Sequence, residues 1–303
     1  MLLRYLNAQN PQSGDRVGTK DRRTLAKNRE EESTMISKTS CIARMIVLAS
    51  FALSSAAWAA GSNAPCSNAS LSGTYGFLHG GRDSHGAPAV AVTQLTFDST
   101  KGTFTGEDTE NTDGVIGTSS VNATYTVAPN CTVTARVTLV SGGAVENVNV
   151  SFVVTPTGFL FLFQKPGAIS SGFGVKQGFA NCTNAGVAGS FGFETTGLFL
   201  AGAPAIGPVA FIGELKLTVN ASGEGVINGR LAASEDGTIL RFAEEPVTGS
   251  YTVDKDCRGT ATITPQGQPA LNFSFVVVDG GNEMLALETD ADAVVNGTLT
   301  KRN

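Results

Sequence analysis

From residue 66 onward, the chain alternates between apolar and polar residues with a period of two. Odd positions from Val133 to Leu139 are apolar and even positions from Thr132 to Thr138 are polar, and residues 211–219 alternate in the same way. Successive side chains of a β-strand point to opposite faces of the sheet, so this pattern predicts strands with one buried and one solvated face.

Turn signals rich in Gly, Asp and Asn separate these segments at 98–102, 112–114, 141–143, 220–223, 235–237 and 279–282. The spacing predicts about eight strands in each half of the chain, with loops short enough for neighbouring strands to pair antiparallel. We therefore expect an all-β protein of two tandem up-and-down β-barrels. Two β-sandwiches are the alternative that the pattern leaves open.

One segment occurs twice. Residues 66–77 read CSNASLSGTYGF and residues 182–193 read CTNAGVAGSFGF, with Cys, Asn, Ala, two Gly and Phe at the same places. Later segments also match in order, among them 102–106 with 225–229 and 149–154 with 272–277. Matches that run through both halves indicate two whole copies of one domain. We expect module 1 at 66–178 and module 2 at 182–303.

The repeat also predicts the disulfides. Each module has one leading and one central cysteine, at Cys66 and Cys131 and at Cys182 and Cys257. Four cysteines allow three connectivities, and the duplication favours Cys66–Cys131 and Cys182–Cys257. No CxxC spacing is present, so we expect structural disulfides rather than a redox or zinc site.

The first 59 residues are expected to lie outside the fold. Residues 1–34 are polar and lack hydrophobic periodicity, so we interpret them as a disordered extension or as a stretch before the true start at Met35. Residues 35–59 have the pattern of a signal peptide, with an apolar run at 45–57 and cleavage near Ala59/Ala60. That run is too short for a membrane-spanning helix. This pattern predicts a secreted or periplasmic bacterial protein.

Charge narrows the range of partners. Residues 60–303 contain 12 Lys and Arg and 21 Asp and Glu, a net charge of −9 with neutral His. An acidic chain is poorly suited to nucleic acid or to anionic membrane surfaces, so we predict no nucleic-acid partner.

The repeated segment resembles the first strand of the calycins, the lipocalin and avidin group of eight-stranded barrels. Gly73-Thr74-Tyr75 and Gly189-Ser190-Phe191 are similar to the Gly-x-Trp motif of that group, with Tyr and Phe in place of Trp and no match to its later Arg. Allene oxide cyclase-like barrels share the strand plan, and that resemblance implies a cyclase or isomerase. The tandem arrangement also resembles secreted bacterial β-proteins.

A small apolar ligand inside a barrel would contact inward aromatic and aliphatic residues. The candidates are Tyr75, Phe77, Tyr125, Val137 and Phe152 in module 1 and Phe191, Phe193, Tyr251 and Phe275 in module 2. The alternative is a barrel whose own side chains fill its interior.

Residues 159–163, FLFLF, are apolar at every position. A strand that is apolar on both faces is normally covered on both. We therefore expect a contact with the second module or another chain through Phe159, Phe161 and Phe163, with cover by a loop as the alternative.

Residues that could carry chemistry are few. His79 and His85 lie with Asp83 in HGGRDSH, which makes them candidates for a metal site but matches no known metal-ligand spacing. Carboxylates occur at Glu107-Asp108, Glu235-Asp236 and Glu244-Glu245 and at Glu288, Asp290 and Asp292. We expect them to be solvated, with weak calcium binding as the alternative at the last three. No Ser–His–Asp set is evident, so we predict neither a catalytic site nor a cofactor.

These observations favour a secreted, non-catalytic binding module for a small apolar ligand. An extracellular structural or adhesive protein and an enzyme of the allene oxide cyclase type are the alternatives.

Overall fold

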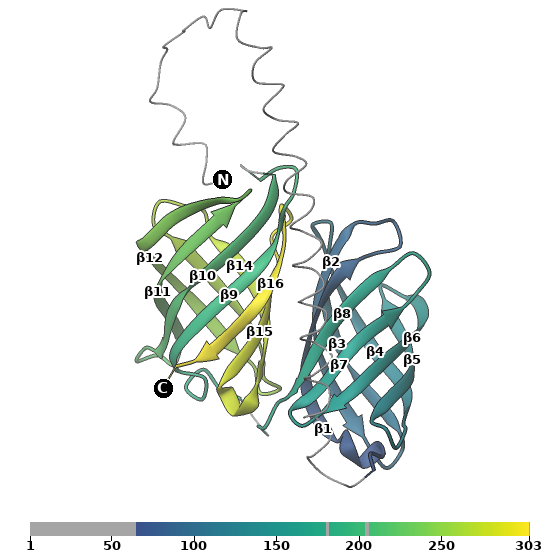
Figure 1. Cartoon of the computed structure of the whole chain (residues 1–303). Coiled ribbons are helices and arrows are strands. Elements are labelled where there is room, and N and C mark those ends of the chain that lie inside the picture. Colours follow the sequence, from purple (N-terminus) through teal and green to yellow (C-terminus); the bar gives the residue numbers. More distant parts are fainter. Residues whose placement is uncertain (1–64, 180–181, 204–205, 303) are drawn as a thin grey trace, which may run out of the picture. The chain divides into compact units, whose positions relative to one another are not determined.

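The computed structural model describes residues 65–179, 182–203 and 206–302. They form two closed antiparallel barrels of eight strands each, so the predicted fold class is confirmed (Figure 1). The β-sandwich alternative is wrong, because β1 pairs with β8 and β9 pairs with β16 to close the two rings.

Every strand pairs with its sequence neighbours, in an up-and-down order. Barrel 1 consists of β1 (Gly73–Arg82), β2 (Pro88–Asp98), β3 (Thr103–Thr112), β4 (Val115–Val127), β5 (Thr132–Ser141), β6 (Ala144–Thr155), β7 (Gly158–Gln164) and β8 (Ile169–Lys176). Barrel 2 consists of β9 (Gly189–Phe199), β10 (Gly207–Val219), β11 (Gly225–Glu235), β12 (Thr238–Val253), β13 (Arg258–Pro265), β14 (Leu271–Val278), β15 (Glu283–Glu288) and β16 (Ala293–Lys301). Two 3-10 helices, η4 (Asn68–Ser70) and η5 (Asp279–Gly281), complete the described elements.

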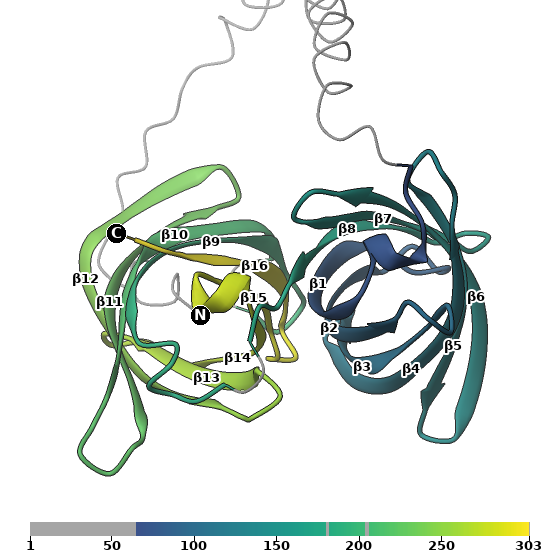
Figure 2. The ribbon, with the colours of Figure 1, turned by 90° about the horizontal axis from the view of Figure 1, so that it is seen from below.

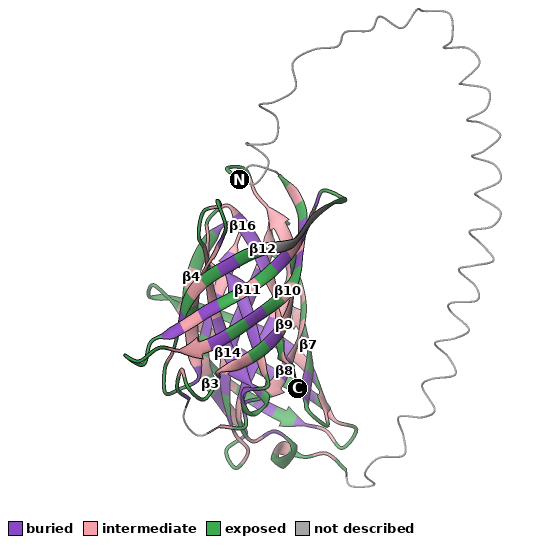
Figure 3. Cartoon of the chain, turned by 90° about the vertical axis from the view of Figure 1, so that its left-hand side faces the viewer, coloured by how far each residue is buried: buried purple, intermediate pink, exposed green. Residues whose placement is uncertain are grey.

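The period-two pattern places one set of side chains inside each barrel. Buried and exposed residues alternate along β10 and β11 in barrel 2 (Figure 3). The inner residues form one apolar core per barrel, centred on Phe104, Phe152 and Phe159 in barrel 1 and on Phe191 and Phe275 in barrel 2.

The repeated segment closes one end of each barrel, and η4 lies across that end of barrel 1 (Figure 2). Leu71 and its counterpart Val187 are fully buried there. The repeated Asn holds the segment in place, since Asn68 Oδ1 accepts from Val127 N at 2.9 Å and Asn184 Oδ1 accepts from Val253 N at 2.8 Å. This pair of equivalent hydrogen bonds explains why both copies carry Asn at this position.

Both predicted disulfides are present. Cys66 is bonded to Cys131 and Cys182 to Cys257, each within its own barrel. Each joins the closing segment to the turn before the fifth strand of its barrel, so the bond ties the closed end to the wall.

Residues 65–302 belong to one compact unit, and the two barrels touch through outward-facing residues. Apolar side chains from β1 and β2 pack against others from β14, β15 and β16; they are Leu78, Val90, Val92, Val276, Val278, Leu285, Leu287 and Val294. Gly76 on β1 allows this close approach, because a Cβ atom there would lie 2.4 Å from Cγ1 of Val278.

The prediction that Phe159, Phe161 and Phe163 form a contact between modules is wrong. All three side chains pack in the core of barrel 1. The alternating residues Leu160 and Leu162 face outward and are 55% and 52% exposed, so the second barrel does not cover this strand. Runs that are buried on both faces occur instead at 90–93 in β2, 275–278 in β14 and 284–288 in β15.

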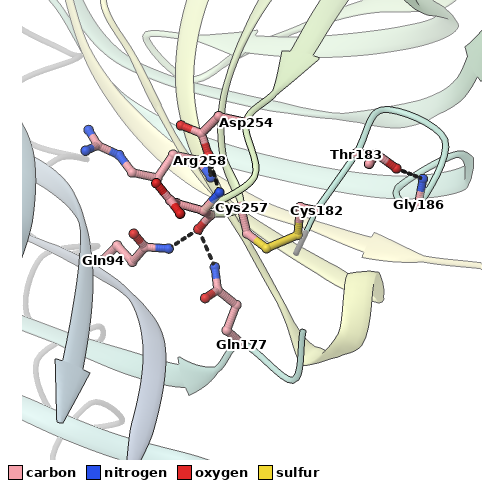
Figure 4. The surroundings of a disulfide bond; sticks show 9 residues. Gln94, Gln177, Cys182, Thr183, Gly186, Asp254, Cys257 and Arg258 are labelled. Atoms are coloured by element: carbon pink, nitrogen blue, oxygen red, sulfur yellow. Dashed lines mark hydrogen bonds between the residues drawn. A yellow bond between two sulfur atoms is a disulfide. The ribbon is translucent and has the colours of Figure 1, made fainter. Parts of the chain in front are cut away.

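Polar contacts frame the apolar interface. Gln94 Nε2 of β2 and Gln177 Nε2 after β8 both donate to the carbonyl of Asp256, beside the Cys182–Cys257 disulfide (Figure 4). Asn111 of β3 is fully buried and donates to the carbonyls of Glu288 at 3.0 Å and Ala293 at 2.7 Å. These bonds join side chains of barrel 1 to backbone carbonyls of barrel 2, of which those of Glu288 and Ala293 belong to buried residues.

Among the described residues, no helix is both long enough and apolar enough to cross a membrane. The expected extension at 1–34 and signal peptide at 35–59 lie outside the described residues.

Candidate ligand-binding site

Barrel 1 contains a cavity of about 160 Å³ at the end opposite its disulfide. An apolar cavity of about 150 Å³ is large enough to hold benzene. The side chains around it come from all eight strands; they include Phe77, His79, Thr93, Leu95, Phe104, Asp108, Glu110, Val121, Val137, Leu139, Val148, Val150, Phe152, Phe161, Phe163 and Ser170.

Aromatic rings form the inner wall of this cavity. Phe77 contacts Phe161 edge-on with ring centroids 4.6 Å apart, and Phe161 contacts Phe152 at 5.6 Å. Strand alternation brings these rings together, because Phe159, Phe161 and Phe163 point inward from one strand opposite Phe77 and His79 of β1. The wall offers an apolar surface to a ligand.

Polar residues interrupt the apolar lining on one side. Strand pairing places Phe77, Thr93 and Asp108 side by side in one row across β1, β2 and β3. The next row toward the open end contains His79, Ala91 and Glu110. Ala91, between His79 and Glu110 in this row, is the smallest of the three side chains and is fully buried.

Asp108 is the most deeply placed acid in the cavity, with 8% of its surface exposed. Thr93 Oγ1 donates a 2.5 Å hydrogen bond to its Oδ1. Burial raises the pKa of Asp108 to about 7, which outweighs the opposing effect of Thr93, and the nearby charge of Glu110 raises it further. At neutral pH this carboxyl is therefore close to half protonated.

His79 lies beside the acids without forming an ion pair. Its Nδ1 is 2.8 Å from Ser170 Oγ, and its ring stacks on Phe77 with centroids 4.9 Å apart. The accessible surface of His79 is intermediate although the residue lies deep in the barrel, because it lines the cavity. Burial lowers the pKa of His79 to about 4, so the imidazole is neutral at pH 7.

Four charged residues surround the open end. Lys165 forms an ion pair with Glu146, and Arg82 Nη1 donates to the carbonyl of Gly86 at 2.7 Å. Asp83 Oδ1 accepts from the backbone N of His85 and Ala87. The rim charges are thus engaged with each other and with the turn between β1 and β2.

Barrel 2 has the same strand plan, but apolar residues replace most of the polar residues that line the cavity of barrel 1. Its buried acids, Glu235 and Glu288, do not line its cavity. In barrel 1, Thr93 lies between Phe77 and Asp108 in the pairing register, and in barrel 2, Gly213 lies between Phe193 and Leu231. Because Phe77 and Phe193 are equivalent in the repeat, Thr93 corresponds to Gly213 and Asp108 to Leu231. By the same registers, His79 corresponds to Thr195, Glu110 to Ala233 and Ser170 to Val295. The cavity that remains is about 60 Å³, the space of a few water molecules, with an almost wholly apolar wall.

The predicted pocket residues divide into two groups. Phe77, Val137 and Phe152 line the cavity of barrel 1, and Phe193, Tyr251 and Phe275 line that of barrel 2. Tyr75, Tyr125 and Phe191 lie in the cores outside these cavities. Thr93, Glu110 and Ser170 also line the cavity of barrel 1, and the sequence pattern did not predict them there.

The prediction that Asp108, Glu235 and Glu288 are solvated is wrong. All three point inward from their strands, and only 4% of Glu235 and 1% of Glu288 is exposed. Inward alternation from Phe104 through Asp108 to Glu110 is the signal that could have placed Asp108 inside barrel 1.

The candidate metal ligands do not come together. Asp83 Oδ2 pairs with Nδ1 of the exposed His85 at 3.3 Å, whereas His79 points into the cavity. Within the described ranges, no three His, Cys, Asp or Glu side chains are grouped as a metal would require.

No protein-family profile matches this sequence, and no curated protein sequence matches it. Two solved structures are similar in part. One is a protein of unknown function from the DUF3598 family of Nostoc punctiforme, with a TM-score of 0.27, 10% identity and coverage of 77% of this chain and 97% of the other. The second is a β-barrel-like protein of the DUF1849 family from Brucella abortus, with a TM-score of 0.20, 10% identity and coverage of 76% and 97%.

Proposed function

We propose that this protein is a binding module that holds one small, mainly apolar molecule in barrel 1. The observation that carries the proposal is the contrast between the two copies. Barrel 1 keeps a 160 Å³ cavity lined by Asp108, Glu110 and Ser170, whereas barrel 2 has Leu231, Ala233 and Val295 at these positions and leaves about 60 Å³. Burying Asp108 and His79 costs stability, and barrel 2 closes with Leu231 and Thr195 at these two positions.

The shape of the cavity fits a binding role. Its inner end is closed by the aromatic core, and its outer end opens between Arg82, Glu146 and Lys165. Small-molecule sites are typically concave and apolar, with a few polar groups that orient the ligand. The size favours a molecule with one ring or a short aliphatic chain. Binding inside an eight-stranded barrel is also what the resemblance to calycins implies.

Native mass spectrometry tests this proposal. The protein is purified from its own host with its disulfides intact, alongside Ala89→Phe, which fills the cavity from β2. Ser120→Phe on the exposed face of β4 is the matched control, because it adds the same ring outside the barrel. We expect a constant additional mass on the wild type and on Ser120→Phe that Ala89→Phe lacks.

An additional mass that persists in Ala89→Phe would place the ligand elsewhere and contradict the proposal. A bare wild-type chain that also fails to bind any member of a library of one-ring compounds would contradict it as well.

A structural or adhesive role is the second candidate. The observation that favours it is the exposed apolar surface of β6 and β7, formed by Val153, Leu160 and Leu162. Analytical ultracentrifugation tests this role, with self-association of the wild type that Leu160→Ser abolishes as the expected result. A monomer at all concentrations would count against association through this surface.

We further propose that the protein is exported, with cleavage near Ala59/Ala60. The two disulfides support this, since such bonds persist in oxidising compartments. N-terminal sequencing of the protein from the host's extracellular and periplasmic fractions tests it, and an intact Met1 in the cytoplasmic fraction would contradict it.

A further inference from the structure

The cavity of barrel 1 contains two inner acids without a cationic partner. Asp108 and Glu110 are successive inward residues of β3, and both line the cavity. The cations that line it lie at the rim, where Lys165 pairs with Glu146 and Arg82 binds a backbone carbonyl. Among the described residues, neither Asp108 nor Glu110 forms an ion pair. The inner half of the cavity is therefore acidic.

We propose that the ligand of barrel 1 is a small organic amine bound as its ammonium ion. The apolar body would contact Phe77, Phe152 and Phe161, and the ammonium group would lie at Asp108 and Glu110. This inference rests on the proposed function and names the chemical class of its ligand.

The hydrogen bonds of the two acids leave acceptors for such a group. Thr93 donates to Oδ1 of Asp108, and Thr112 donates to Oε1 of Glu110 at 2.5 Å. The second oxygen of each carboxylate is left to accept from a ligand. An ammonium group offers several donors, and its hydrogen bonds to carboxylates are stronger than those between neutral groups.

The surroundings of the acids also favour a cation. Aromatic faces attract cations through their quadrupole, and this attraction grows when water is excluded. His79 is the nearest basic side chain on β1, and burial keeps its pKa near 4, so it neither neutralises the acids nor repels an ammonium group at pH 7. An anionic ligand, in contrast, would face the two carboxylates directly.

Proton release gives the site a measurable signature. Without ligand, Asp108 has a pKa of about 7, set by burial and by Glu110; His79, Arg82, Asp83, Glu146 and Lys165 are the other titratable groups around the cavity. A bound ammonium ion favours the carboxylate, so the proton of Asp108 leaves to the buffer. Binding should therefore release a larger fraction of a proton at pH 6 than at pH 8, and affinity should rise with pH over this range.

Isothermal titration calorimetry with three ring compounds tests the inference. Benzylamine, benzyl alcohol and benzoate have similar shapes and carry positive, neutral and negative groups. We expect benzylamine to bind at least about tenfold more tightly than benzyl alcohol, with benzoate the weakest, because one charge-assisted contact is worth about that factor. Repeating the titration in buffers of different ionisation enthalpy measures the released protons.

Variants assign the effect to the two acids. Asp108→Asn and Glu110→Gln should each lower benzylamine affinity about tenfold or more and change benzyl alcohol affinity little. Asp108→Asn should also abolish the proton release. Glu194→Gln, an exposed outward position on β9, removes one negative charge without touching the cavity and should change nothing.

The outcomes separate this inference from the proposed function. Benzyl alcohol binding as tightly as benzylamine would overturn the amine assignment and leave barrel 1 as a binding site. Failure of benzylamine to bind, or amine binding that both acid variants leave intact, would overturn it too. If Asp108→Asn fails to fold, Glu110→Gln and the wild-type proton release still decide the question.

Discussion

Asp108 and Leu231 occupy the same position in the two barrels. Asp108 on β3 lies opposite Thr93, and Leu231 on β11 lies opposite Gly213, at the same place in the pairing register. One duplicated fold therefore holds a buried acid with its own hydrogen-bond donor in one copy and an aliphatic side chain in the other. The hydrogen-bonded pair of Asp108 and Thr93 is therefore a feature of barrel 1 that the shared fold does not require.

The buried Asp108 should make the protein less stable as pH rises. Its pKa in the folded protein, about 7, lies above the ordinary value of 3.8, so the folded state favours the neutral carboxyl. The free energy of unfolding is therefore highest, as far as Asp108 is concerned, below pH 4. It falls by about 4 kcal/mol in total as pH rises to 7. In urea denaturation from pH 4.5 to 8, Asp108→Asn should flatten this decline. An unchanged slope in the variant would show that Asp108 is not buried as described.

Glu288 should contribute a second decline that extends to higher pH. Burial raises its pKa to about 8, with further increases from Asp290 and Asp292, and its Oε2 has no hydrogen-bond partner among the described residues. Because the folded state favours the neutral carboxyl of Glu288, the free energy of unfolding should fall by about 5 kcal/mol as pH rises from about 4.5 to 8. Glu288→Gln should remove the part of the decline between pH 7 and 8, which Asp108→Asn leaves in place. A variant with the wild-type slope in that interval would contradict the assignment.

Gly76→Ala should disrupt the packing between the barrels. The new methyl group would lie 2.4 Å from Val278 and 2.9 Å from Val276, and overpacking of this kind costs about 1–3 kcal/mol. Gly192 is the counterpart in barrel 2, where a Cβ atom would meet only Arg302 at 3.9 Å, so Gly192→Ala is the matched control. Thermal unfolding should show a loss in the first variant and little change in the second. Equal losses of stability in Gly76→Ala and Gly192→Ala would contradict the close packing described around Gly76.

Each disulfide should stabilise its own barrel. The Cys66–Cys131 bond closes a loop with a sequence separation of 65, and loops of this length contribute about 4 kcal/mol in the chain-entropy model. The double variant Cys66→Ser/Cys131→Ser should lower the unfolding temperature, and Cys182→Ser/Cys257→Ser should do so to a similar extent. Thiol titration of the denatured wild type should detect no free thiol among these four cysteines. Free thiols in protein from its host would contradict a structural role.

The two barrels could be predicted from the sequence because the signals for their strands are local and occur in both copies. Alternation along segments such as 132–139 determines which residues point inward, and the duplicated Cys restricts the disulfide pairing. The Asn in the repeated segment could be recognised from the repeat, but its role as an acceptor for Val127 or Val253 depends on a strand more than 50 residues away.

The polar cavity could not be predicted with the same success. Asp108 was interpreted as solvated because a carboxylate beside another carboxylate, Glu107, usually is. The strand separates the two: Glu107 faces outward and pairs with Arg258, and Asp108 faces inward to Thr93. Phe104, four residues earlier, indicates which face of β3 is the inner one. The β2–β3 pairing then places Thr93 opposite Asp108, and closure of the ring by β8 brings Ser170 to the interior.

Methyl NMR with benzyl alcohol tests most directly the claim that barrel 1 alone holds the ligand. Leu95, Val137, Val148 and Val150 report on the cavity of barrel 1, and Leu215, Leu217 and Leu231 report on the interior of barrel 2. The account predicts saturable shifts of the first set, unchanged signals from the second, and no response in Ala89→Phe. Shifts centred on barrel 2 or on the outer surface, or no shifts at saturating ligand, would contradict it.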